Sequence, residues 1–280
     1  MGPLRSLSSP FGTEPIEEVA LDRPPLVRVL AQVRFPPLSV LSIGDDAAHR
    51  IAMELSQDYP VFNEGREMVV TITPQGVQQQ PGGGRTWQVQ DAAGKWQVTF
   101  APNFVTVHTS AYVSRNDFVA RLNQVVHTFA SATGPPRTER IGIRYINRLE
   151  EEDITDLATL VRPEMLGGLA APHADYSVKV ERALNEVLYN LAPKQVDVTD
   201  SLQARWGVLP SGAMIDPTLP GLSTSSWILD MDSFRTGSGA FTAAAVSSAA
   251  LELADRAYRF FRWVVNDDFL MRFGARHELD

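Results

Sequence analysis

Alternating apolar and polar residues predict two well-defined strands, one near the N-terminus and one in the middle of the chain. In residues 26–35 every second position is apolar, and prolines follow at positions 36 and 37. The polar residues between these positions are Arg28, Gln32 and Arg34. Residues 138–149 (TERIGIRYINRL) alternate in the same way. There, one face carries Arg140, Arg144 and Arg148, and the other carries Asn147 among apolar residues. A period of two is typical of strands that bury one face.

Shorter segments complete the predicted elements. Alternation indicates further strands over 68–73, 87–90, 96–100, 105–110, 196–208 and 225–232. Apolar residues three or four positions apart indicate helices over about 45–57, 115–133, 180–191 and 241–265. The segment QQQPGGGR at 78–85 is predicted to be a loop. Strands in hairpin-like succession with helices between them predict an α+β fold, with a largely antiparallel sheet covered by helices and a long C-terminal amphipathic helix.

The domain organisation is predicted from changes in composition. Residues 1–23 have no periodicity and are expected to form a flexible leader. Residues 24–150 form an N-terminal α+β half and residues 151–280 a C-terminal α+β half. The best candidate for the boundary is the Pro-, Gly- and Ala-rich segment 163–176. Whether the halves form one continuous domain, with one sheet or two, is left open.

Composition excludes several classes of protein. The chain has 280 residues, a formal net charge of −8 and no cysteine, which rules out disulfides, cysteine-ligated metals and thiol nucleophiles. The acidic balance argues against broad capture of nucleic acid, and no apolar stretch is long enough for a membrane helix. Without a targeting signal, a cytoplasmic location is the expectation. Only three of the 25 basic residues are lysines, which suggests GC-rich coding and hence a bacterial or phage origin.

The common catalytic motifs are absent. The chain has neither of the phosphate-binding glycine patterns, and it lacks the G-x-S-x-G nucleophile motif of hydrolases. None of the five histidines has a second histidine at a metal-binding spacing. We therefore assign no catalytic residue, expect no cofactor or metal, and lean against an enzyme.

An acidic pair closes the predicted strand at 225–232. Asp230 and Asp232 are two residues apart, so both carboxylates lie on one face of that strand. Such a pair suits a divalent cation or acid–base work. It suits equally well a structural role, in which the carboxylates accept hydrogen bonds from the residues that follow.

The arginines of the two main strands form the most unusual pattern. Arg140, Arg144 and Arg148 are spaced by about 13 Å along one face. If the strand with Arg28 and Arg34 lies beside them, the sheet carries a basic surface with Asn147 at its edge. Arginine forks bind carboxylate or phosphate through two hydrogen bonds, which suits an anionic ligand or an acidic partner. The alternative is that these arginines pair with nearby acids as a solvated face.

Four sequence blocks carry a family resemblance. They are PPLVRVLAQVRFPP at 24–37, W-x-V-x-F at 96–100, RIGIRYINRL at 140–149 and ILDMD at 228–232. With them the chain resembles a sporadically distributed, uncharacterised family of bacterial and phage proteins, from residue 24 to about residue 273. The resemblance implies a cytoplasmic accessory protein, and it places Arg144, Tyr145, Asn147 and Arg148 in the family signature.

Two functional hypotheses follow. The first is a non-enzymatic module that binds a protein partner, in phage–host conflict, defence or toxin neutralisation. The second is a domain that binds, or acts on, an anionic small molecule through the arginine-lined sheet face, with Asp230 and Asp232 as accessory groups. Nucleic acid and membranes are not expected as partners, and self-association is left open.

Overall fold

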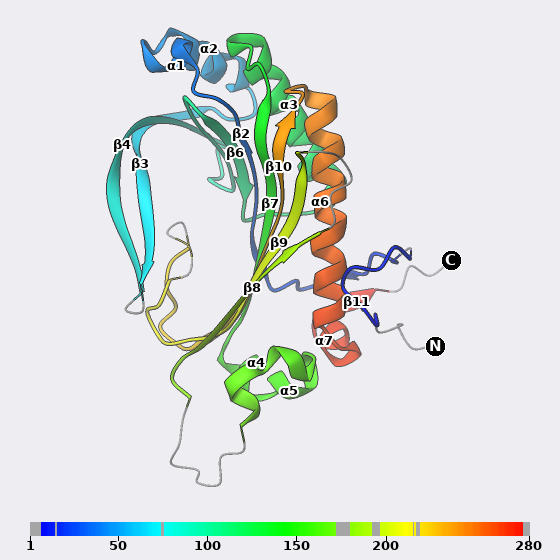
Figure 1. The fold of residues 1–280 in the computed structure, drawn as a ribbon. Helices are drawn as coiled ribbons and strands as arrows, with labels where there is room; N and C mark the ends of the chain where they lie inside the picture. The colour runs from blue at the N-terminus through cyan, green and yellow to red at the C-terminus, as the bar shows by residue number, and fades with distance from the viewer. Residues whose placement is uncertain are drawn as a thin grey trace.

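The computed structural model describes residues 7–14, 16–73, 76–171, 180–191, 197–214, 216 and 219–276. Within these ranges the fold is α+β, as predicted (Figure 1). The strands are β1 (Ala20–Leu21), β2 (Leu26–Arg34), β3 (Val61–Thr73), β4 (Gly76–Gln90), β5 (Trp96–Ala101), β6 (Phe104–Thr109), β7 (Thr138–Leu149), β8 (Ala183–Asn190), β9 (Thr199–Leu209), β10 (Ser226–Gly239) and β11 (Ala275–Arg276). The helices are α1 (Ser39–Ser42), α2 (Asp46–Leu55), α3 (Arg115–Thr133), α4 (Glu151–Thr155), α5 (Leu157–Leu160), α6 (Ala243–Val264) and α7 (Asp267–Arg272), with 3₁₀ turns at Pro163–Met165 and Gly167–Ala170.

Both halves of the chain contribute to one antiparallel sheet. In the described residues it has nine strands in the order β3-β4-β5-β6-β2-β7-β10-β9-β8. β2 and β7 pair at its centre, where Arg34 lies opposite Arg140 and Leu30 opposite Arg144. The arginine-bearing strands are therefore neighbours, which was the condition for a shared basic surface.

The two halves repeat one connectivity. β2 is followed by α1 and α2, the meander β3–β6 and the long helix α3. β7 is followed by α4 and α5, the meander β8–β10 and the long helix α6. In each half the last strand of the meander pairs with the first strand of that half. The sheet therefore extends outward from its centre in the same way on both sides.

Helices cover one face of the sheet and leave the other open (Figure 1). The apolar side of α3 is buried against the sheet, and so is most of the apolar side of α6. The α3 residues are Phe118, Leu122, Val125, Val126 and Phe129. On the opposite side of the sheet, β3, β4 and the described residues of the β9–β10 loop (210–214, 216 and 219–225) extend away from α6 (Figure 1). We call the face without α3 and α6 the open face.

Capping residues at both ends of α3 explain why it begins and ends where the sequence predicts. The Ser114 hydroxyl accepts a hydrogen bond from the backbone N–H of Asp117 at 3.1 Å and caps the N-terminus. Gly134 ends the helix at φ 58°, a left-handed conformation that favours glycine.

Two predicted elements are wrong. Residues 183–190 form strand β8 rather than a helix. Leu184 and Leu188, which are four apart, also share one face of a strand, and the residues between them alternate in burial. The predicted loop at 78–85 lies within β4, which pairs with β3 as far as Gly76. Because β4 pairs with β5 only from Trp87 onward, this part is a two-stranded ribbon, where proline and glycine are tolerated.

The segment expected to be a flexible leader has contacts in its described part. Strand β1 pairs with β11, and the Val19 N–H donates to the Tyr258 hydroxyl at 2.8 Å. The ring of Phe11 packs against Tyr189, with centroids 4.8 Å apart. Residues 163–171 of the proposed boundary carry the 3₁₀ turns, and residues 172–176 lie outside the described ranges. No helix in the described residues is both long and apolar enough to cross a membrane.

Candidate functional site

The open face carries the polar residues that alternate with the core. On it lies a groove of about 730 Å³, lined by residues of β2 to β7 and of β10 together with Asp216 of the β9–β10 loop. The groove crosses seven adjacent strands from β3 to β10, roughly 29 Å at the usual strand separation.

The half of the groove built by the N-terminal strands is largely uncharged. Its uncharged polar lining is Gln32, Thr86, Gln88, Gln97, Thr99, Thr106 and His108, and its two charged residues are Arg34 and Arg66. Gln97 donates to Thr99 Oγ1 at 2.9 Å, and Gln32 donates to Thr106 Oγ1 at 3.3 Å. These are neutral, partly exposed groups that can exchange partners, so this half offers both donors and acceptors to a ligand.

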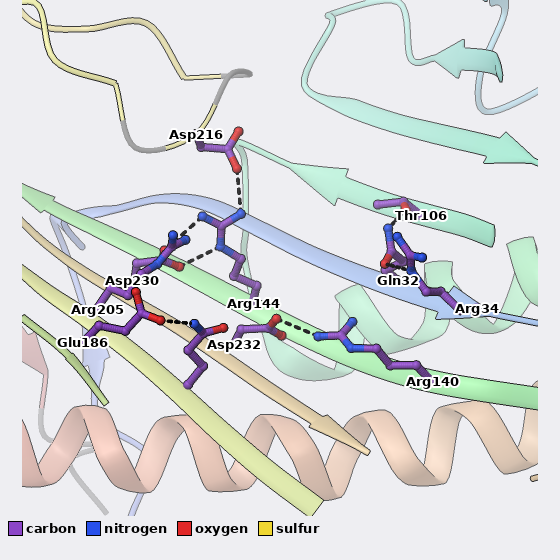
Figure 2. Close-up of polar contacts among 11 residues, drawn as sticks. Gln32, Arg34, Thr106, Arg140, Arg144, Glu186, Arg205, Asp216, Asp230 and Asp232 are labelled. Atoms are coloured by element: carbon purple, nitrogen blue, oxygen red, sulfur yellow. Dashed lines mark hydrogen bonds and ion pairs between the residues drawn. The ribbon is translucent and has the colours of Figure 1, made fainter. Parts of the chain in front are cut away.

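The half built by the C-terminal strands is ionic (Figure 2). Arg144 binds Asp230 through two parallel hydrogen bonds, Nε to Oδ1 at 2.7 Å and Nη2 to Oδ2 at 2.9 Å. Arg205 also donates to Asp230, and Arg140 donates to Asp232 at 2.7 Å. Asp230 is only 2 % exposed, so it depends on both of its arginines for compensation.

Strand register explains why these groups meet. In the β7–β10 pair, Asp232 lies opposite Arg144 and Asp230 lies opposite Ile146. Residues paired in this way share a face, so the arginine row of β7 and the acid pair of β10 form one cluster. Arg140 and Arg144 of the predicted arginine surface therefore lie in one cluster with the predicted acid pair.

Arg140 lies flat on the open face because of its neighbours. A Cβ at Gly142 would stand 2.7 Å from Arg140 Nη1, so only glycine leaves room for the guanidinium in this position. The guanidinium also lies over the ring of Phe234, 4.5 Å from the centroid. Gly142, Phe234 and Asp232 together fix the direction of this arginine.

In the cluster, burial and the neighbouring charges shift the pKa values of Arg144 and Asp232 in opposite directions. Burial disfavours the charged form of Arg144, but the Asp230 and Asp216 carboxylates outweigh it, and the pKa of Arg144 is raised. Burial raises the pKa of Asp232, and the nearby guanidinium of Arg140 offsets this in part. Arg144 is thus a permanent cation held between carboxylates.

No protein-family model matches this chain, and no curated protein matches its sequence. The resemblance indicated by the sequence blocks therefore stays a prediction. Of its signature residues, Arg144 lines the groove, whereas Tyr145 packs against the core and Asn147 is buried.

The remaining predicted site residues lie in different settings. Asn147 donates to the Leu229 carbonyl at 3.5 Å and does not line the groove. Arg148 donates to the carbonyl of Pro220 at 3.0 Å and so ties down the β9–β10 loop. Arg28 is half-buried, and burial lowers its pKa, whereas the charge of Asp216 raises it.

Among the titratable residues that line the groove, sequence reasoning missed three. Burial lowers the pKa of His108 to about 4, and the positive charge of Arg28 adds to this effect. Asp216 reaches Arg144 from the β9–β10 loop, and Arg66 comes from β3. His108 could have been found from its place in the alternation of β6. No local sequence pattern indicates Asp216, because its contact with Arg144 depends on how the loop folds.

Two arginines of the groove have no acid beside them. Arg34 is exposed, and its hydrogen bond goes to the neutral Gln32 at 2.9 Å. Arg66 is exposed as well and lines the same groove. Within the described part of the chain, neither forms an ion pair with a carboxylate. Their charges are available to a ligand.

The acid pair is engaged by arginine rather than gathered around a cation position. No group of three or more metal-ligating side chains occurs among the residues that the structure describes. The cluster is arranged for charge compensation.

Proposed function

We propose that this protein is a binding module, and that an anionic small molecule binds in the groove on its open face. The observation that carries the proposal is the presence of Arg34 and Arg66 in a groove of about 730 Å³, without a carboxylate partner in the described residues. Exposed guanidinium groups beside neutral donors and acceptors suit a ligand that combines a carboxylate or phosphate with several hydrogen-bonding groups.

The groove favours a small molecule over a protein partner. Its volume lies within the roughly 300–1,000 Å³ of small-molecule sites. The centre of a protein interface is usually depleted of charge and rich in aromatic residues. Here glutamine, threonine and arginine dominate, and the ring of Phe234 is covered by Arg140.

Thermal unfolding with simple anions tests the proposal. Inorganic phosphate, citrate and ATP are the probes, and adenosine is the neutral control. We expect at least one anion, but not adenosine, to raise the melting temperature. When the free anion concentration is one hundred times its Kd, the free energy of unfolding should rise by about 2.7 kcal/mol.

Substitutions of single arginines test where the anion binds. Arg34→Ala and Arg66→Ala should each reduce the shift, whereas Arg50→Ala, which removes an exposed arginine from α2, should not. If no anion stabilises the wild-type protein, or if Arg50→Ala acts like Arg34→Ala, the proposal is wrong.

The first hypothesis from the sequence, a module for a protein partner, stays a prediction. Phage–host conflict, defence and toxin neutralisation rest on the family resemblance alone. A cytoplasmic location belongs to the proposal, because it gives access to phosphorylated and carboxylated metabolites. Native mass measurement of the protein from its own cell separates a bound small molecule from a stoichiometric protein.

A further inference from the structure

A chain of side-chain hydrogen bonds in the groove fixes the direction of its groups. Arg34 Nε donates to Gln32 Oε1 at 2.9 Å, and Gln32 Nε2 donates to Thr106 Oγ1 at 3.3 Å (Figure 2). Because a guanidinium can only donate, the oxygen of Gln32 must face Arg34 and its nitrogen must face Thr106. The proton of the Thr106 hydroxyl has no acceptor in the described part of the chain. It can therefore be donated to a ligand.

A second hydroxyl lies directly opposite the first. Thr99 pairs with Thr106 across β5 and β6, and it accepts a hydrogen bond from Gln97 Nε2 at 2.9 Å. Side chains that are directly opposed on two strands are about 4.5–5.5 Å apart at Cβ, so the two hydroxyls form a pair on the groove floor. Each hydroxyl has one proton and a further lone pair. The pair can both donate to and accept from the hydroxyl groups of a ligand.

Two guanidinium groups lean over the strand positions beside this hydroxyl pair. Arg34 lies opposite Arg140 in the β2–β7 pair. Gln32 lies opposite Gly142 in the same pair. Arg34 reaches Gln32, and Arg140 lies over Gly142, so both guanidinium groups point the same way along adjacent strands. Arg140 is bound to Asp232, whereas Arg34 has no carboxylate partner in the described residues. An anionic group can bind Arg34 with the charge of Arg140 beside it.

The charge of the groove suits an anion with two negative charges. Among the described residues, four arginines and two aspartates line it, which leaves an excess of two positive charges. His108 is neutral, because its pKa is about 4. This local excess lies in a chain whose formal net charge is −8. A phosphate monoester carries about −1.5 to −2 charges at pH 7, so it matches the groove better than a single carboxylate does.

The groove offers no surface on which an aromatic base can stack. Among the described lining residues, the only phenylalanine, tyrosine or tryptophan is Phe104, which is 8 % exposed. Nucleic-acid bases are commonly held by stacking on aromatic side chains. Hydroxyl groups need no such surface, since threonine and glutamine bind them through hydrogen bonds.

We propose that the groove binds the phosphate ester of a sugar or another polyol, with the phosphate on Arg34 and the hydroxyl groups of the ligand on Thr99 and Thr106. This inference rests on the proposed function and deepens it, because it names the class of anion and its direction. Gln32 pairs with Thr106, so Arg34 is a diagonal neighbour of Thr106, about 7–8 Å away. One sugar phosphate spans that distance.

Calorimetry with ribose 5-phosphate and inorganic phosphate tests the class of ligand. Ribose 5-phosphate should bind the wild-type protein at least about tenfold more tightly than inorganic phosphate does. Arg34→Ala should weaken the binding of both, because both place a phosphate on this guanidinium. Equal affinities of the wild-type protein for the two probes would overturn the inference.

The two threonines separate the sugar from the phosphate. Thr99→Val and Thr106→Val should each reduce the affinity for ribose 5-phosphate and leave that for inorganic phosphate unchanged, which also shows that the variants are folded. Thr159→Val, which changes an exposed threonine of α5, is the matched control and should bind both probes like the wild type. If neither Thr99→Val nor Thr106→Val reduces the preference for ribose 5-phosphate, the inference is wrong.

AMP, which adds a base to the same sugar phosphate, provides a further arm. It should bind no more tightly than ribose 5-phosphate, and a gain of about tenfold or more would overturn the assignment to a sugar or polyol. If inorganic phosphate and ribose 5-phosphate bind equally and both depend on Arg34, the inference fails while the proposed function stands. If no anion binds, both fail.

Discussion

The two halves of the open face have the same architecture and opposite chemistry. In the groove, the N-terminal strands carry glutamine, threonine, one neutral histidine and the two arginines without a carboxylate partner in the described residues, whereas β7, β9 and β10 carry arginines paired with aspartates. Charges that are partly buried must be compensated, and the C-terminal half compensates its own. The neutral half needs no such compensation, and its Arg34 and Arg66 are exposed. The difference separates a region that compensates its own charges from the region in which we propose that the ligand binds.

The largest expected effect comes from breaking the ionic half. Arg144→Met leaves Asp230 buried with one arginine instead of two, and it should lower the free energy of unfolding by about 3–5 kcal/mol. The matched change Arg34→Met in the neutral half should cost less than about 0.5 kcal/mol. Urea denaturation of both variants makes the comparison. Equal costs would mean that the two halves do not differ in the way described.

The next effect depends on pH. His108 has a pKa of about 4 in the folded protein against 6.5 when unfolded, so below pH 6.5 the unfolded state binds more protons. Stability should therefore fall as the pH drops from 6.5 towards 4, by at most about 3 kcal/mol from this residue. His108→Gln should remove that part of the slope, as unfolding curves at several pH values would show. A slope unchanged by the substitution would contradict the burial of a neutral imidazole.

A smaller effect is expected at the centre of the sheet. Gly142→Ala places a methyl group where Arg140 now lies, and the guanidinium must leave Asp232. Because the pair is partly exposed, the cost should be about 1 kcal/mol. The pKa of Asp232 should rise further, which carbon-detected NMR titration can follow. A carboxyl pKa that does not change would show that Arg140 keeps its place.

The smallest effect should come from the neutral half. Thr106→Val removes the acceptor of one 3.3 Å hydrogen bond from Gln32, in a partly exposed position where water can replace it. The free energy of unfolding should change by less than about 0.5 kcal/mol. Thermal unfolding measures this directly, and a loss above about 1.5 kcal/mol would place this residue in a rigid network instead.

Periodicity predicted most of the fold, because a helix or strand that buries one face has apolar residues at regular spacing in the sequence. Strand β7 and helix α6 were found from it nearly to the residue. Strand β8 was missed because leucines four apart fit one face of a helix and of a strand equally well. The β3–β4 ribbon was missed because its proline and glycines are the residues typical of loops.

The candidate site was predicted in pieces. The arginines and the acid pair were each found from strand alternation, but their pairing depends on which strands are neighbours and in which register. Asp216 could not be found at all, since a loop leaves no periodic pattern that tells where it folds. The part of a site that lies on strands can be read from one sequence, and the part contributed by loops cannot.

The most direct test of the account is an NMR titration of the wild-type protein with citrate, followed through the side-chain amides of glutamine. If the neutral half of the groove binds the ligand, the resonances of Gln32, Gln88 and Gln97 should shift together and saturate with one affinity. Gln124, which lies on α3 and donates to Asp58 at 2.7 Å, should not shift. Binding in the groove is contradicted if citrate leaves the resonances of the three groove amides unchanged or shifts that of Gln124 to the same extent.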